Sequence, residues 1–167
     1  ESAGQRVNYA NAILLQGQAY LALGDLPAAV SAGKSALDIA QHHNLPFLRY
    51  AAHLLLGQVS EKRSFLERAI HHYRAAAATT ERVQRGLTIT LRPGFLEDKA
   101  QAWRALIALY LRNGRTGSAF EILERAKSQV LLGYLANQES LRWVKSDASS
   151  RALTEELEHL RAEHQWY

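Results

Sequence analysis

The sequence predicts an all-α protein built from antiparallel helix pairs, with about seven helices in a single domain over residues 1–167. Apolar residues recur with the 3.6-residue period of an amphipathic helix along most of the chain. Breakers are few and stand between the periodic segments, and only three prolines occur, at Pro27, Pro46 and Pro93. Small and large residues also recur at a fixed spacing, which indicates internal repeats.

Short breakers separate the first four helices. The first helix is expected over residues 10–23, and Gly24 ends it. Asp25 then caps a second helix, and Pro27 fits its first turn because the missing N–H has no partner there. This helix runs to about His43, where the stretch HNLP interrupts the periodicity. A third helix over 47–59 and a fourth over 64–84 follow.

The second half of the chain begins with the stretch GLTITLRPG at 86–94, which is typical of an extended linker. A fifth helix over 95–114 ends at Asn113 and Gly114, and Thr116 is expected to cap a sixth. The sixth helix runs to about residue 136 and becomes almost wholly apolar. After a loop at 146–150, a capping helix at about 151–167 carries a leucine stripe. The apolar end of the sixth helix packs either on this stripe or on a partner outside the chain.

Composition narrows the class of protein. A chain of 167 residues suffices for one domain that buries roughly 70% of its unfolded surface. With 47% hydrophobic and 22% charged residues it has ordinary globular composition. No apolar run is long enough to cross a bilayer, so we expect a soluble, cytoplasmic protein without membrane contact. The first residue is Glu1 and methionine is absent, which suggests a segment of a longer protein.

Three helix pairs share one frame of small and aromatic residues. The step from Gly17 to Ala29 equals the step from Gly57 to Ala69, and Trp103 and Ala119 fit the same frame. A small residue on each helix lets two backbones approach closely, while larger neighbours fill the flanks. The repeats are expected at about 8–43, 47–84 and 95–136.

This frame resembles the tetratricopeptide pattern W-x2-L-G-x2-Y followed by A-x3-F, over about residues 8–136. The resemblance implies a right-handed superhelix of helix pairs that binds proteins or peptides. The sequence departs from the family at Gly33, Ser60 and Ile107. The intervals from Gly17 to Gly57 and from Gly57 to Ile107 are also longer than the usual repeat. We therefore expect longer helices or insertions.

The region from the fifth helix onward is similar to the helical repeats that precede the caspase-like CHAT domain of bacterial proteins. The matching residues are Phe95, Leu96, Glu97, Asp98, Ala119, Phe120, Glu121, Glu124, Arg125, Ala126, Lys127, Leu131, Leu132 and Leu135. The closing stretch LTEELEHLRAEHQWY is similar to the helix that enters that domain, whereas Gln129 stands where arginine is more usual. The resemblance implies that this chain is the helical part of a larger protein. The cysteine and histidine pair of a caspase-like peptidase cannot lie in this chain, because it has no cysteine.

A groove along the first helices of the pairs is the predicted binding surface, since these helices line the concave side of such arrays. The residues predicted to bind a peptide or protein partner are Asn11, Gln18, Gln58, Lys62, Gln101, Arg104 and Arg112, with Leu14, Leu21, Ala51, Leu54 and Ala108 between them. Their amides and guanidinium groups suit a peptide backbone and its carboxylates. Alternatively, the chain's own capping helix fills this groove. The missing C-terminal domain is a further candidate partner. The positions that hold lysine and asparagine in carboxylate-clamp tetratricopeptide proteins are not matched, so chaperone-tail binding is not implied.

Catalytic, cofactor and metal sites are not expected. The sequence has no cysteine, no HExxH, no G-x-S-x-G elbow and no phosphate-binding loop. Adjacent histidines such as His71 and His72 point about 100° apart on a helix, which suits a chelate poorly. Residues 62–92 carry seven basic side chains, so nucleic-acid binding there is an alternative function, although a solvated helix face explains the charge as well. A structural or dimerising role is the remaining alternative.

Overall fold

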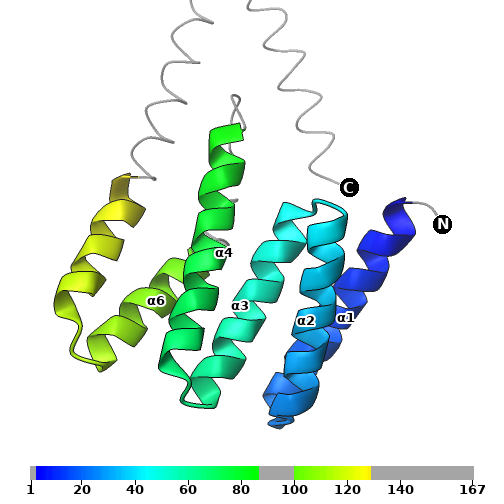
Figure 1. The fold of residues 1–167 in the computed structure, drawn as a ribbon, viewed down its shortest axis with the longest axis horizontal. Coiled ribbons are helices and arrows are strands. Elements are labelled where there is room, and N and C mark those ends of the chain that lie inside the picture. Colours follow the sequence, from blue (N-terminus) through cyan, green and yellow to red (C-terminus); the bar gives the residue numbers. More distant parts are fainter. Residues whose placement is uncertain (1–2, 87–99, 129–167) are drawn as a thin grey trace, which may run out of the picture.

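The computed structural model describes residues 3–86 and 100–128, and all regular structure in these two segments is helical, as predicted. The helices are α1 (Ala3–Leu23), α2 (Leu26–His42), α3 (Pro46–Lys62), α4 (Leu66–Gly86), α6 (Gln101–Arg112) and an unlabelled helix over residues 116–128, which is yellow in Figure 1. Most of the predicted linker at 86–94, the FLED segment at 95–98, the apolar run at 129–136, the loop at 146–150 and the helix at 151–167 lie outside the described residues.

The turns at 24, 44, 64 and 114 share one backbone conformation. The left-handed residues are Gly24, Asn44, Ser64 and Gly114, with φ of 82°, 50°, 59° and 69°. In each turn the next residue donates its N–H to the carbonyl oxygen five positions back, at 2.9 Å in all four cases. This is the Schellman motif, which satisfies the last carbonyls of a helix and reverses the chain. The predicted ends at Gly24, HNLP and Gly114 are confirmed.

The start of α2 agrees with the sequence, whereas α1 and the 116–128 helix start differently, and α3 begins one residue earlier and α4 two residues later than predicted. Asp25 caps α2 as predicted, since its Oδ1 accepts the N–H of Ala28 at 3.0 Å. The prediction that Thr116 is a cap is wrong, because the helix already includes it and the carbonyl of Arg115 accepts the N–H of Ala119. Helix α1 begins at Ala3, earlier than expected. The sequence did not indicate this start because the first turns of α1 are largely exposed and carry no apolar stripe.

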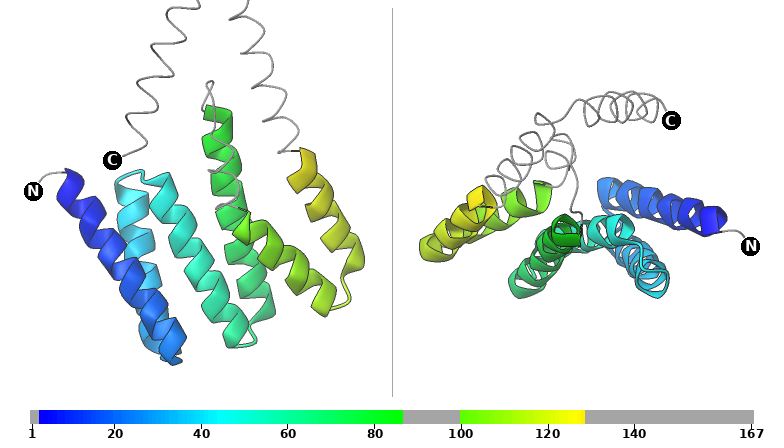
Figure 2. Two further views of the ribbon diagram at one scale, coloured as in Figure 1. Left: turned by 180° about the vertical axis from the view of Figure 1, so that it is seen from behind. Right: turned by 90° about the horizontal axis from the view of Figure 1, so that it is seen from above.

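The helices form two rows. α1 packs on α2 and α3, α2 also packs on α3, α3 packs on α4, and α4 packs on α6. Seen from above, α1, α3 and α6 lie along one side and α2 and α4 along the other (Figure 2, right). The first helices of the three pairs therefore share one face of the array.

Two apolar clusters hold the rows together. One joins α1, α2 and α3 and is rich in alanine, with Leu14, Leu48, Leu55 and Val59 as its large members. The other joins α3, α4, α6 and the 116–128 helix around Tyr73, Trp103, Leu106 and Tyr110. Alanine dominates where two backbones come close, because larger side chains would hold them apart.

The glycines of the repeat frame lie at close contacts, as predicted. A Cβ on Gly57 would lie 2.5 Å from the ring of Tyr73, and one on Gly17 would lie 2.6 Å from Leu55 and 3.0 Å from Ala32. When the first pair is aligned on the second by these two glycines, Gly33 occupies the place of Tyr73. A Cβ on Gly33 would lie 2.8 Å from Leu56, so α3 fills the space that an aromatic ring takes in the next pair.

Candidate functional site

An open pocket of about 520 Å³ lies on the face that α1, α3 and α6 share, and we call it the central pocket. It is lined by Leu21, Gln58, Glu61, Lys62 and Arg112. The three residues from α3 stand at i, i+3 and i+4 and therefore share one helix face. Helix α1 adds an apolar side chain and α6 adds a guanidinium group. The structure thus brings together three of the predicted binding residues: Gln58, Lys62 and Arg112.

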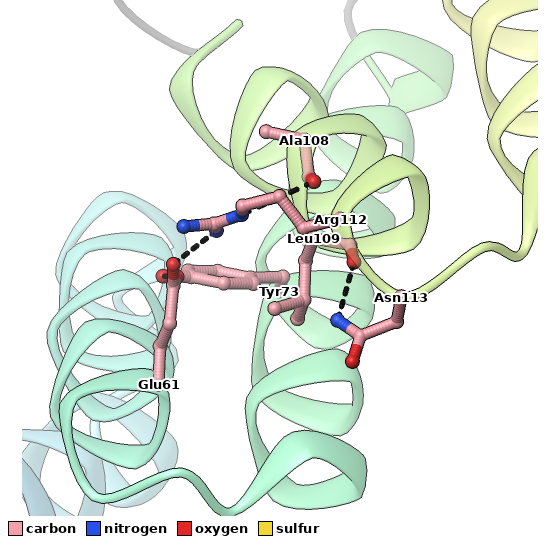
Figure 3. A network of polar contacts seen from close by, with 6 residues as sticks. All are labelled: Glu61, Tyr73, Ala108, Leu109, Arg112 and Asn113. Carbon is pink, nitrogen blue, oxygen red and sulfur yellow. Dashed lines mark hydrogen bonds and ion pairs between the residues drawn. The ribbon is translucent and has the colours of Figure 1, made fainter.

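Glu61 is the polar centre of this region (Figure 3). The hydroxyl of Tyr73 donates to Glu61 Oε2 at 2.7 Å, and Arg112 Nη2 donates to Oε1 of the same carboxylate. Arg112 Nε also donates to the carbonyl oxygen of Ala108 at 3.3 Å. One carboxylate therefore joins α3, α4 and α6.

The hydrogen-bond network fixes which charges remain for a ligand. Burial, together with the hydrogen bond to Glu61, raises the pKa of Tyr73, so its hydroxyl remains a donor at neutral pH. Arg112 uses two of its five N–H groups within the protein and keeps the rest. Lys62 forms no ion pair with a described residue and is exposed. The central pocket therefore offers a free ammonium group beside a positioned guanidinium group.

A second pocket of about 280 Å³ continues from the same network towards the turns that end α3 and α6. It shares Glu61 and Arg112 with the central pocket. Asn113 also lines it and donates from Nδ2 to the carbonyl oxygen of Leu109 at 2.7 Å. The polar surface is thus longer than the central pocket alone.

The other predicted binding residues are exposed but do not line the central pocket: Asn11, Gln18, Gln101 and Arg104. The expectation that Leu14 faces a groove is wrong. Its side chain is 5% exposed and packs in the cluster with Leu48 and Leu55, because α1 contacts α3 directly. Sequence reasoning also missed Glu61, although it lies beside Lys62 and one turn from Gln58.

The described part of the basic segment 62–92 places its charges at several sites. The guanidinium groups of Arg63 and Arg68 lie 4.9 Å and 5.1 Å from the ring centre of Phe65. That of Arg74 lies 5.8 Å from the ring centre of Tyr110. Such cation–π contacts orient these side chains over aromatic rings. Lys62 lies in the central pocket instead.

Two histidines that are distant in the sequence meet between α3 and α4. His53 Nδ1 and His72 Nδ1 are 3.2 Å apart, and the two ring centres are 5.5 Å apart. His42, by contrast, lies beside Asp38 of its own helix. Among the described residues, no group of three or more histidine, aspartate or glutamate side chains is arranged to hold a metal ion.

The surroundings of these two rings favour their neutral forms. Burial and the nearby His72, His71 and Arg49 lower the pKa of His53 from 6.5 to about 4. Burial, His71 and Lys34 lower the pKa of His72. For both rings, the protonated imidazole would lose hydration and lie near other positive groups.

Stability should therefore depend on pH through His53. The unfolded chain binds a proton at about pH 6.5 and the folded chain only near pH 4, so the free energy of unfolding should fall as the pH drops through this window. Replacing His53 by glutamine should make that fall smaller. Urea denaturation at several pH values in phosphate-free buffer measures both slopes. Equal slopes for the wild type and His53→Gln would contradict the assignment.

Comparison of the chain with protein-family models, curated proteins and solved structures finds no match in any of the three. Within residues 3–86 and 100–128, no helix combines the length and the hydropathy that crossing a bilayer requires.

Proposed function

We propose that this chain is a non-catalytic interaction module whose α1, α3 and α6 face binds an extended, acidic peptide segment of a protein partner. The observation that carries the proposal is the central pocket, which gathers side chains from all three first helices. No single one of these three helices provides all the side chains that line the pocket.

The chemistry of the central pocket suits a carboxylate on a peptide. Lys62 and the unused N–H groups of Arg112 provide charge-assisted hydrogen bonds, which are stronger than neutral ones. Gln58 can donate to and accept from a peptide backbone. Leu21 adds an apolar contact, so the pocket could bind a peptide that contains both acidic and apolar residues.

The fold part of the proposal is a right-handed, tetratricopeptide-like superhelix of about seven helices. The repeated Schellman turns support it, and Gly24 stands as far from Ser64 as Gly17 does from Gly57. In a longer protein, such an array would position or control a caspase-like CHAT domain. In the matching ERAK motif, Arg125 pairs with Glu81 of α4 at 2.6 Å, and Ala126 packs on the core. These contacts give two residues of the motif a packing role.

Peptide binding is tested with an array of peptides about ten residues long, in which acidic residues and free or amidated C-termini vary. Acidic peptides should be retained, and Lys62→Glu should weaken their affinity about tenfold or more by fluorescence anisotropy. Arg82→Glu makes the same charge reversal on α4 and should have no effect. Equal weakening by both variants, or salt-dependent retention of DNA instead of peptides, would contradict the proposal.

The proposed link to a caspase-like domain has a separate test. The gene that encodes this chain should continue into a domain with a cysteine and histidine pair. A reading frame that lacks such a domain would remove this part of the proposal and leave peptide binding untouched.

A further inference from the structure

Helix α3 lies between α2 and α4 (Figure 1). Each of these three helices carries basic side chains that act on His53 or His72. We call them the basic cluster: Lys34 of α2, Arg49 and His53 of α3, and His71 and His72 of α4. Arg49 and His53 stand at i and i+4, so they share one face of α3. Tertiary packing then places His72 against His53, with the two Nδ1 atoms 3.2 Å apart.

The basic cluster has no acidic partner among the described residues. The ion pairs of the described acids run to His42, Arg112, Arg115, Arg125 and Lys127. In addition, Arg49 Nε is buried and has no hydrogen-bond partner within the part of the chain that the structure describes. A buried donor without an acceptor is unfavourable, so an acceptor from outside the chain would stabilise this arrangement.

We propose that the basic cluster is a binding site for a phosphate group, held by Arg49, Lys34 and the paired imidazoles of His53 and His72. A phosphate group fits better than a single carboxylate because it carries more charge and three acceptor oxygens, enough for several converging donors. This site lies outside the central pocket and does not depend on peptide binding there.

A divalent metal ion is the competing occupant of a histidine pair. Zinc in proteins usually takes three or four protein ligands, and the described residues offer no group of that size. Arg49 and Lys34 would also repel a cation, whereas they attract an anion. A bound anion would offset the positive surroundings that lower the pKa of both histidines and would raise both pKa values.

The test adds inorganic phosphate to the whole chain. Isothermal calorimetry measures the binding, and NMR reports on the histidine rings. Saturable binding should shift the ring resonances of His53 and His72, raise the pKa of both and take up protons from the buffer near neutral pH. Arg49→Gln should weaken binding about tenfold. Lys34→Gln should also weaken phosphate binding. Because Lys34 is exposed on α2, this variant should fold normally and keeps the test valid if Arg49→Gln misfolds.

Arg6→Gln is the matched control because it removes the same charge from an exposed site on α1. It should leave phosphate affinity unchanged. An equal loss of phosphate affinity in all three variants, or ring resonances that do not shift with phosphate, would overturn the site. Ring resonances that respond to Zn²⁺ but not to phosphate would overturn it in favour of a metal.

The source of the phosphate group is found with a phosphoserine peptide and its unphosphorylated form. Tighter binding of the phosphorylated peptide than of inorganic phosphate assigns the site to a phosphorylated protein. Equal affinity assigns it to free phosphate. Both results support the site, and binding of the unphosphorylated peptide with equal strength contradicts it.

Discussion

Replacing Gly57 by leucine is expected to lower the free energy of unfolding by about 3 kcal/mol. The first added carbon alone would lie 2.5 Å and 2.6 Å from two ring carbons of Tyr73. That ring is only 1% exposed and is tethered to Glu61 by a hydrogen bond, so it cannot move into solvent. Urea denaturation followed by circular dichroism measures the loss.

Gly117 provides the control for this substitution. A Cβ there would meet no atom within 4 Å, so Gly117→Leu should keep or slightly raise the stability, because leucine favours helix over glycine. Similar losses for Gly57→Leu and Gly117→Leu would show that the substitution acts through the helix backbone rather than through the contact with Tyr73.

Replacing Tyr73 by alanine is expected to cost about 3–5 kcal/mol, the usual range for deleting a buried aromatic ring. Tyr73 lies in the cluster that joins α3, α4, α6 and the 116–128 helix, so the cavity would open between two helix pairs. The change also removes a donor from Glu61.

Tyr73→Phe separates packing from hydrogen bonding. It keeps the ring and loses only the bond to Glu61, so it should cost about 1–2 kcal/mol. Thermal and urea unfolding of the two variants give the comparison. If phenylalanine and alanine destabilise equally, the ring is not packed as the structure shows.

Local signals in the sequence were enough to place the helix ends at Gly24 and Gly114 and the start of α2. Gly24 and Gly114 adopt the left-handed conformation that a Schellman turn needs, and Asp25 supplies the side-chain oxygen of a cap. These effects depend on a few adjacent residues, which is why they can be predicted. Boundaries without such signals were missed, as at the exposed start of α1.

The site was predicted only in part, because its chemistry depends on tertiary contacts. The helical period indicated that Gln58 and Lys62 share a face with partners on α6. It did not show that Glu61 meets Tyr73 of the next helix and Arg112, which lies far along the chain. The contact of His53 with His72 was hidden for the same reason, since the last part of α3, a turn and the first turns of α4 separate them.

Leu14 shows a different limit. Neighbouring positions on a helix point about 100° apart, so a small error in register moves a side chain from a groove to the core. The sequence alone does not fix how far α1 rotates against α3. Their direct contact buries Leu14 and leaves Leu21 at the central pocket.

The central claim is that helix pairs stack through small residues in a recurring register. The third pair fills these positions differently, because Ile107 stands in the place of Gly57 and Leu123 in the place of Tyr73. A double-mutant cycle on Gly57→Leu and Tyr73→Ala tests the claim most directly, with the free energy of unfolding as the readout.

If Gly57 is small in order to accept the ring of Tyr73, the leucine should cost about 3 kcal/mol in the wild type and less than about 1 kcal/mol once the ring is removed. The same cost in both backgrounds would show that the two positions do not share a contact, and would contradict the register on which the helix pairing and the central pocket depend.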